Sequence, residues 1–387
     1  MDNIEKTKRI LFLTGTRADF GKMKTLMLDV ESNPSFENHI FITGMHTLKL
    51  YGNTSNEVKR AGFKNTYTYV NQIVGEPMEV ILATTISGLS RYVHELQPDM
   101  IVIHGDRVEA LAGAIVGSLG NILVAHIEGG ELSGTIDELI RHSVSKLSHL
   151  HLVANKNAQD RLIQMGESRD SVHVIGSPDI DVMISKDLPS LKTSKEYYEL
   201  PFDNYGVVLF HPVTTEYKDM RVIARDFVDA LLESDRNYLV VYPNNDSGCK
   251  FILEEYRRLE ADDRFRVAPS LRFEYFLTLL KNSDFIIGNS SAGIREAPFY
   301  GLPSVNVGTR QNNRFLHTSI VSVNYDTALI LTAINTASSM RVCEKNDYFG
   351  SGNSTELFMN IINTPKTWET SVQKQFNDIG FPKPVAA

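Results

Sequence analysis

Residues 100–130 read MIVIHGDRVEALAGAIVGSLGNILVAHIEGG, and this stretch indicates the fold most clearly. Two short apolar runs, 100–104 and 122–127, flank a longer segment, 108–119, whose apolar residues suit a helix. Strands that are covered on both faces read as continuous apolar runs. A strand, a helix and a second strand in succession form the unit from which parallel sheets are built. This stretch therefore predicts a parallel sheet with helices packed on it.

The same alternation extends in both directions along the chain. Further apolar runs predict strands at 9–14, 39–43, 150–154, 205–210, 238–242, 284–288 and 304–307. Helical patterns occupy 22–30, 78–96 and 136–147, and a final pair of helices is expected after residue 353. The alternation of strands and helices is interrupted at 177–198, where Ser, Pro, Asp and Lys accumulate. We expect two Rossmann-like, doubly wound α/β domains, 1–185 and 186–365, with the active site in the cleft between them.

Composition narrows the function classes. Of the 387 residues, 42% are hydrophobic and 22% are charged, and the net charge of −8 argues against a nucleic-acid partner. With only Cys249 and Cys343, neither a disulfide framework nor a cysteine zinc site is expected, and the histidine and carboxylate spacing predicts no metal. No signal-like run follows the polar start, and no segment is long enough for a membrane helix. We expect a cytoplasmic protein without a cofactor or a membrane partner.

The loops that follow the first-half strands carry groups for anion binding and proton transfer. Residues 15–22 (GTRADFGK) lead into a helix and offer Arg17 to an anion, but they match neither a dinucleotide fingerprint nor a Walker loop. Asp106 and Arg107 follow the 100–104 strand, where the carboxylate suits proton transfer and the guanidinium suits phosphate. Either loop could instead be a simple helix cap.

The loop that follows the 122–127 strand is acidic and rich in glycine. It reads EGGELSGTID from Glu128 to Asp137. Asp137 and Arg141 are four residues apart, so we expect them to pair on one helix face. Glu128, at the strand tip, would then be the freer carboxylate. A solvated acidic loop is the alternative interpretation.

The second half supplies hydroxyl groups and cations. His211 follows the 205–210 strand, and a polar loop containing Asn244 follows the next strand. Ser290 and Ser291 open a helix after the 284–288 strand, with Glu296 one turn further on and Arg310 beyond the next strand. Hydroxyls and backbone N–H groups at a helix start suit phosphate, and a carboxylate can accept hydrogen bonds from ribose. A helix capped by serine that binds nothing is the alternative.

Seven stretches carry a resemblance to a known family, in the same order along the chain: 14–22 (TGTRADFGK), 103–111 (IHGDRVEAL), 126–142 (HIEGGELSGTIDELIRH), 211–215 (HPVTT), 242–248 (YPNNDSG), 288–296 (GNSSAGIRE) and 308–311 (GTRQ). Together they resemble the UDP-N-acetylglucosamine 2-epimerase family, in particular its hydrolysing branch, which feeds sialic acid synthesis. The non-hydrolysing branch looks different in the loop after Glu128.

The resemblance implies a glycosyltransferase-B-like fold, with C-terminal helices at 366–387 that cross back to the first domain. It implies conversion of UDP-N-acetylglucosamine and water to N-acetylmannosamine and UDP, often by a homodimer or homotetramer. Some relatives carry serine at Gly21, so a hydroxyl contact would be lost here. The matching acid and base positions are Asp106, Glu128 and Asp137, with His211 beside the β-phosphate. The implied nucleotide-binding residues are Arg17, Arg107, His211, Asn244, Ser290, Ser291, Glu296 and Arg310.

Three alternatives remain open at this point. The same chemistry could act on a UDP-linked diacetamido-trideoxyhexose of the diacetylbacillosamine type, on the way to legionaminic acid. A glycosyltransferase with the same two-domain fold would leave the acidic loop without a role. A sensor would bind a UDP-sugar without turning it over.

Overall fold

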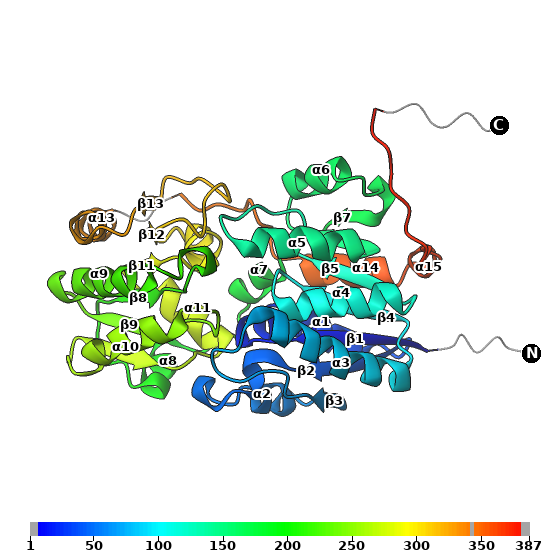
Figure 1. Ribbon diagram of the computed structural model, residues 1–387, viewed down its shortest axis with the longest axis horizontal. Helices are drawn as coiled ribbons and strands as arrows, with labels where there is room; N and C mark the ends of the chain where they lie inside the picture. The colour runs from blue at the N-terminus through cyan, green and yellow to red at the C-terminus, as the bar shows by residue number, and fades with distance from the viewer. Residues whose placement is uncertain (1–6, 341–343, 381–387) are drawn as a thin grey trace, which may run out of the picture.

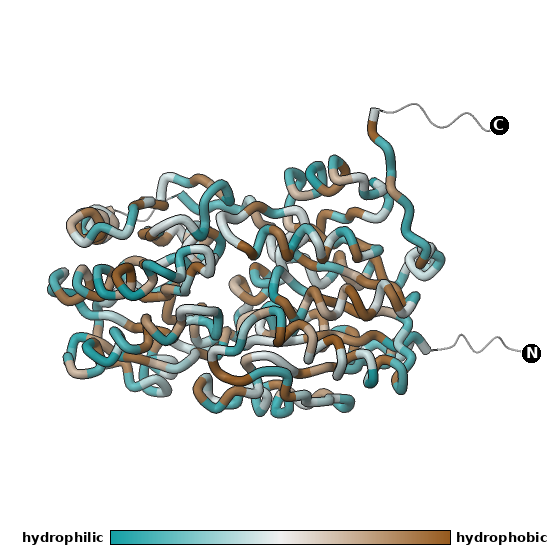
Figure 2. The backbone as a smooth tube through the Cα atoms, in the orientation of Figure 1, coloured by the Kyte–Doolittle hydropathy of each residue, from teal (hydrophilic) through white to brown (hydrophobic). Residues whose placement is uncertain are grey.

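The computed structural model describes residues 7–340 and 344–380. In Figure 1 the chain forms two lobes, with the amino-terminal half on the right and most of the second half on the left. Each lobe is built around one sheet, and hydrophobic segments concentrate along the strands inside each lobe (Figure 2). The predicted pair of doubly wound α/β units is confirmed.

Within the described residues, the first sheet has seven parallel strands in the order β3-β2-β1-β4-β5-β6-β7. Helices α1, α2 and α14 pack on one face and α3, α4 and α5 on the other. The strands are β1 (Lys8–Thr14), β2 (Phe36–Ile42), β3 (Asn65–Thr68), β4 (Met100–His104), β5 (Leu123–Ile127), β6 (Leu150–Val153) and β7 (Val172–Val174). The helices up to the crossing are α1 (Arg17–Ser32), α2 (Ser55–Arg60), α3 (Met78–Leu96), α4 (Val108–Leu119), α5 (Ile136–Leu147) and α6 (Lys156–Gln164).

The second sheet has six parallel strands among the described residues, in the order β10-β9-β8-β11-β12-β13. Helices α9, α10 and α13 cover one face, and α7, α8 and α11 cover the other. The strands are β8 (Gly206–Leu209), β9 (Tyr238–Val241), β10 (Phe265–Ala268), β11 (Phe285–Gly288), β12 (Ser304–Val307) and β13 (Ile320–Val323). The helices are α7 (Pro178–Met183), α8 (Leu191–Tyr198), α9 (Met220–Glu233), α10 (Cys249–Glu260), α11 (Phe273–Lys281), α12 (Glu296–Tyr300) and α13 (Thr327–Ser339).

The predicted helices 78–96, 108–119 and 136–147 are confirmed residue for residue. Helix α1 begins at Arg17, five residues before the predicted start at Lys22. The reason is a capping box, in which the Thr16 side chain accepts a hydrogen bond from the Asp19 backbone N–H and Asp19 bonds back to Thr16. Arg17 is therefore the first residue of a helix rather than part of a loop.

Over residues 7–340 and 344–380, the chain crosses between the lobes twice. The first crossing leaves β7 and enters α7, and the second returns to the first sheet at α14 (Ser354–Ile362), followed by α15 (Pro365–Trp368). Phe358 and Ile362 of α14 are buried in the core of the first lobe, beside α1 (Figure 1). The return thus precedes the predicted residue 366, because α14 already carries an apolar face that the first sheet covers. No helix forms in 369–380, and 381–387 lie outside the described residues.

Candidate active site

A cavity of about 280 Å³ lies between the two lobes. Both sheets reverse their strand order at one point, between β1 and β4 in the first and between β8 and β11 in the second. Ligands of such sheets bind beyond the carboxyl ends of the strands at this switch point. All of the predicted site residues line the cavity: Arg17, Asp106, Arg107, Glu128 and Asp137 from the first lobe, and His211, Asn244, Ser290, Ser291, Glu296 and Arg310 from the second.

The ion pairs of the acidic loop differ from those predicted. Asp137 does not pair with Arg141; its Oδ2 accepts a hydrogen bond from Arg310 Nη2 of the second lobe at 2.7 Å. Arg141, fully buried, donates to Asp106 instead. A pair four residues apart on a helix contributes only about 0.5 kcal/mol, so better-placed partners from other elements displace it. Burial would raise the pKa of Asp137, but the charges of Arg310 and Arg141 hold that pKa below its ordinary value.

Glu128 is also not the free carboxylate that the sequence predicts. Its Oε1 lies 2.7 Å from Arg295 Nη2 and 3.3 Å from both Lys22 Nζ and His104 Nε2. Burial alone would raise the pKa of Glu128, yet Arg295 and Lys22 lower it well below its ordinary value. Glu128 also adopts a left-handed backbone conformation, with φ of 67°. Such strain in a non-glycine residue is typical of functional sites.

Glu128 belongs to a buried network that sequence reasoning missed. Lys22 contacts Asp179 at 3.4 Å and Glu296 at 3.7 Å, so this one ammonium group serves carboxylates from three segments. A lysine directly before the buried Met23 on the inward face of a helix is the signal that could have revealed it, because a buried cation needs a carboxylate partner. The other members are His104, Glu131, Ser177, Arg295 and Arg314.

His211 is held as a neutral imidazole. Its Nδ1 accepts a hydrogen bond from the Asn244 backbone N–H at 3.2 Å, so the proton resides on Nε2. Burial, together with the nearby charges of Arg310 and Arg107, lowers the pKa of His211 well below its ordinary value. The side chain therefore offers an N–H donor to the cavity without a permanent charge.

The arginines of the site bridge the two lobes. Arg107 lies 3.3 Å from Glu109 in its own lobe and 3.5 Å from Asp246 in the other. Arg17 pairs with Glu57 and also donates to Ser270 Oγ of the second lobe at 2.6 Å. An anion in the cavity would thus meet guanidinium groups that already have carboxylate partners.

The turn that presents Ser290 and Ser291 depends on Gly288. Its φ is 137°, and a Cβ there would lie 2.0 Å from the Leu209 carbonyl oxygen of the neighbouring strand. Ser290 caps a short 3-10 turn, Ser291–Gly293, rather than the continuous helix expected, and Glu296 begins α12. Both serines and the Glu296 carboxylate still face the cavity.

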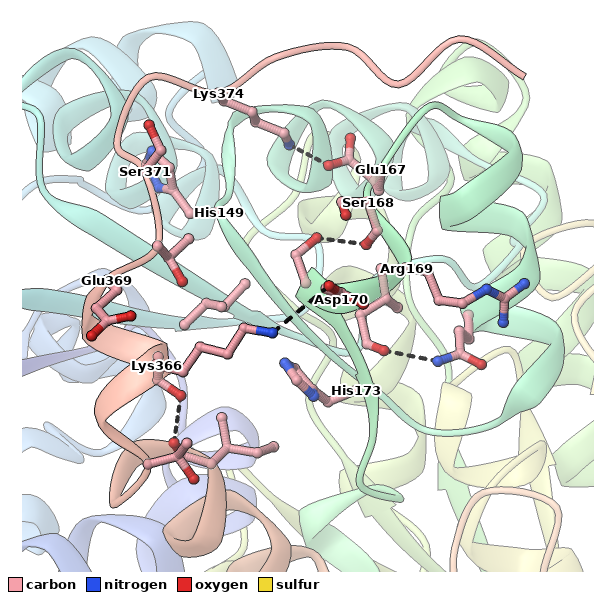
Figure 3. A pocket seen from close by; sticks show the side chains of 18 of the residues that line it. His149, Glu167, Ser168, Arg169, Asp170, His173, Lys366, Glu369, Ser371 and Lys374 are labelled. Atoms are coloured by element: carbon pink, nitrogen blue, oxygen red, sulfur yellow. Dashed lines mark hydrogen bonds and ion pairs between the residues drawn. The ribbon is translucent and has the colours of Figure 1, made fainter. Parts of the chain in front are cut away.

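A second, larger groove of about 1180 Å³ contains none of the predicted site residues. It lies between β7 and the segment after α14, and Figure 3 shows Lys374 reaching across to Glu167 and Lys366 pointing toward Asp170. Its charged side chains pair with one another or face solvent, so it offers no comparable convergence of groups.

In the described part of the chain, no helix is both long and apolar enough to cross a membrane.

Solved structures share this architecture. A Methanocaldococcus jannaschii UDP-GlcNAc 2-epimerase, in complex with UDP-GlcNAc and UDP, superposes with a TM-score of 0.79 at 19% identity over 92% of this chain and 99% of its own. A Neisseria meningitidis UDP-GlcNAc 2-epimerase bound to UDP-GlcNAc gives 0.76 at 18% identity, with the same coverage. The fold and the cavity between the lobes define an α/β protein of the glycosyltransferase-B-like class.

Sequence comparison narrows this class to one family. The family model described as UDP-N-acetylglucosamine 2-epimerase matches residues 28–363. A protein of Neisseria meningitidis serogroup B named UDP-N-acetylglucosamine 2-epimerase is 55% identical over 96% of this chain and 99% of its own length. A Legionella pneumophila UDP-N,N'-diacetylbacillosamine 2-epimerase (hydrolyzing) is 31% identical over 92% and 96%. The chain belongs to the UDP-N-acetylglucosamine 2-epimerase family.

Proposed function

We propose that this protein is a hydrolysing UDP-N-acetylglucosamine 2-epimerase, which converts UDP-N-acetylglucosamine and water to N-acetylmannosamine and UDP. One observation carries the proposal: carboxylates of the first lobe face hydroxyls and arginines of the second across a single cavity. Similarity to the Neisseria protein named UDP-N-acetylglucosamine 2-epimerase supports UDP-N-acetylglucosamine as the substrate. A 30% identical Escherichia coli relative named polysialic acid biosynthesis protein P7 supports a role in sialic acid synthesis.

The reaction needs both the carboxylates of the first lobe and the hydroxyls and arginines of the second. A carboxylate removes the C2 proton while the C1–O bond breaks and its electron pair leaves with UDP, which gives 2-acetamidoglucal. Water then adds its oxygen to C1 and gives one proton to a carboxylate, while a second group delivers a proton to C2 from the opposite face. Cations and N–H donors around the diphosphate stabilise the leaving group. Ser290, Ser291, Arg310 and the Nε2–H of neutral His211 would serve this purpose, with Arg17, Arg107, Asn244 and Glu296 on the rest of the nucleotide.

The carboxylates differ in their electrostatic environment, which constrains their roles. Glu128, beside Arg295 and Lys22, would enter the reaction ionised. Asp137 is ionised through Arg310, a residue that we also assign to the nucleotide. A substrate diphosphate that draws Arg310 away would therefore raise the basicity of Asp137 at the moment it is needed. Asp106 and Glu128 would share the two proton transfers, with Asp137 orienting or exchanging the proton.

The same site could act on a UDP-linked diacetamido-trideoxyhexose instead. The 31% identical Legionella relative, named for that substrate, favours this second candidate. The two sugars differ at C4 and C6, away from the C1 and C2 atoms that react. The choice therefore depends on the sugar pocket rather than on the carboxylates.

Proton NMR of the purified protein with each sugar in heavy water would test the proposal. We expect UDP and free N-acetylmannosamine in equal amounts, with one deuterium at C2. Conversion of the diacetamido sugar alone would favour the second candidate. Accumulation of UDP-N-acetylmannosamine without free sugar would contradict hydrolysis, and UDP binding without turnover would contradict an enzyme.

A further inference from the structure

Arg295 is buried behind the residues that line the cavity and does not line it itself. It is 1% exposed and is absent from the cavity lining, although its neighbour Glu296 and its partner Glu128 both line the cavity. It precedes α12 in the second lobe, whereas Glu128 follows β5 in the first. Its guanidinium therefore reaches Glu128 from the protein side, across the boundary between the lobes.

Two glutamates of the acidic loop share this guanidinium. Nη1 donates to both oxygens of Glu131 at 2.6 and 2.8 Å, and Nη2 lies 2.7 Å from Glu128 Oε1. Among the charged neighbours that lower the pKa of Glu128, Arg295 is the strongest. The loop from Glu128 to Glu131 is thus tied at both ends to one residue of the other lobe.

The same side chain contacts both crossings between the lobes. Nη2 also donates to Ser177 Oγ on the first crossing, and the guanidinium carbon lies 4.5 Å from the ring centre of Phe349 on the second. The crossings run side by side: the Ser177 N–H donates to the Phe349 carbonyl at 2.7 Å, and a Cβ on Gly350 would come within 3.0 Å of Gly176. A rotation of one lobe about these crossings therefore moves Arg295 relative to Glu128.

We propose that Arg295 is a positioning residue, which fixes Glu128 as a carboxylate aimed into the cavity and couples that carboxylate to the paired crossings. The inference rests on the proposed function, in which Glu128 acts ionised. Lysine could not replace it fully, because a single ammonium cannot donate in the plane to Glu131, Glu128 and Ser177 at once.

The test compares Arg295→Gln and Arg295→Lys with the unaltered protein. In Arg295→Gln we expect kcat to fall by about 100-fold or more, while the Kd for UDP changes by less than about threefold, since Arg295 does not line the cavity. Without the guanidinium, only Lys22 and His104 oppose the effect of burial, so the pKa of Glu128 should rise and the acid limb of the pH–rate profile should move to higher pH. Arg295→Lys should recover part of kcat and of the profile.

Glu167→Gln is the matched control, because it removes a buried charge of the first lobe that lies outside the cavity. It should lower the melting temperature without moving the acid limb. A wild-type rate and profile in Arg295→Gln would overturn the proposal, as would an equal shift in the control. If Arg295→Gln does not fold, the pH–rate profile of Arg295→Lys tests the proposal instead: an acid limb unchanged from that of the unaltered protein would overturn it.

A second readout separates this inference from the proposed function. Carbon NMR of the Glu128 carboxylate, assigned with Glu128→Gln, reports its titration whether or not the sugar is turned over. A wild-type protein inactive on UDP-N-acetylglucosamine would refute the proposed function alone. An unchanged Glu128 titration in Arg295→Gln would refute the role of Arg295 alone.

Discussion

Gly21 of α1 has no room for a side chain, because Phe273 of α11 packs directly against it. A Cβ at this position would lie 2.3 Å from Phe273 Cβ, across the boundary between the lobes. A serine at this position would not fit without moving α11. Phe273 thus occupies the space that a side chain at position 21 would need.

Gly21→Ala should therefore force the lobes apart. We expect a loss of about 1–3 kcal/mol in the free energy of unfolding and weaker UDP binding, because overpacking displaces α11. Phe273→Ala in the same chain should relieve part of the loss. Calorimetric melting and UDP titration of both single variants and the double variant give the coupling between the two residues. Strictly additive effects would show that the contact does not limit closure.

The effects of the three carboxylates that we assign to proton transfer should be separable from nucleotide binding. Asp106→Asn, Glu128→Gln and Asp137→Asn should each lower kcat by about 100- to 10,000-fold. UDP affinity should change little in the first two, whereas in the third it should rise, because Arg310 loses its partner. Deuterium incorporation at C2 and UDP titration provide the measurements. Asp170→Asn, at an exposed carboxylate of the second groove, is the control.

At the scale of elements, α5 has a fixed carboxyl end. Lys374 Nζ donates to the carbonyls of Ser145, Lys146 and Ser148 at 3.0, 2.8 and 2.6 Å, and it lies 2.6 Å from Glu167. An ammonium at this end of a helix satisfies carbonyls that have no partner within the helix and complements the helix dipole. The segment after α15 thus locks the helix that carries Asp137 at its other end.

Lys374→Met should destabilise the protein by roughly 2 kcal/mol, because it removes these bonds and leaves Glu167 with fewer partners. Lys366→Met is the matched control, since its ion pair with Asp170 at 3.8 Å is exposed on both sides. The midpoint of urea unfolding compares the two. Equal midpoints would mean that the bonds from Lys374 to the end of α5 contribute nothing to the free energy of unfolding.

Stability should depend on pH through Glu167. Burial would raise its pKa, but hydrogen bonds from His151, Lys146 and Lys374 lower the pKa to about 2, below the ordinary 4.5. A depressed folded-state pKa gives stability that is present above about pH 4.5 and is lost as the pH falls toward 2. Glu167→Gln should be less stable at neutral pH and show a flatter acid dependence. Unfolding at several pH values would reveal this, and parallel curves would refute it.

At the scale of the whole molecule, Asn245 links the two lobes by hydrogen bonds. This residue of the second lobe is 1% exposed and bonds to Gln72, Ile73 and Gly75 of the first at 2.8–3.0 Å. It is next to Asn244 of the cavity lining. The lobes are thus in contact beside Asn244 as well as at the crossings.

Asn245→Ala should favour separated lobes. We expect UDP affinity to fall roughly tenfold, since net hydrogen bonds of about 1 kcal/mol each are lost. The radius of gyration from small-angle scattering with UDP should also exceed that of the unaltered protein. Asn237→Ala, whose amide bonds to Asn204 within the second lobe, is the control. An unchanged scattering profile and an unchanged UDP affinity would contradict a role of Asn245 in holding the lobes together.

The sequence predicts the strand–helix alternation well because buried parallel strands leave continuous apolar runs. It does not predict β3, β7, β10 and β13, which lie at the sheet edges, are short and are only partly apolar. The predicted site residues line one cavity because all of them follow strand ends, but the predicted ion pair between Asp137 and Arg141 is wrong. Arg295 and Arg310 reach Glu128 and Asp137 from more than 160 residues away, and no local spacing encodes such pairs.

Helix α14 has a consequence for synthesis. Phe358 and Ile362 fill the core of a sheet whose strands all precede residue 175. While the chain emerges from the ribosome, helices α1 and α2 can cover part of one face of that sheet, but the rest of this face stays exposed until nearly the whole polypeptide has been made. The second lobe, whose strands all precede residue 324, can complete its sheet sooner. The nascent amino-terminal lobe is therefore the part that a chaperone would need to shield.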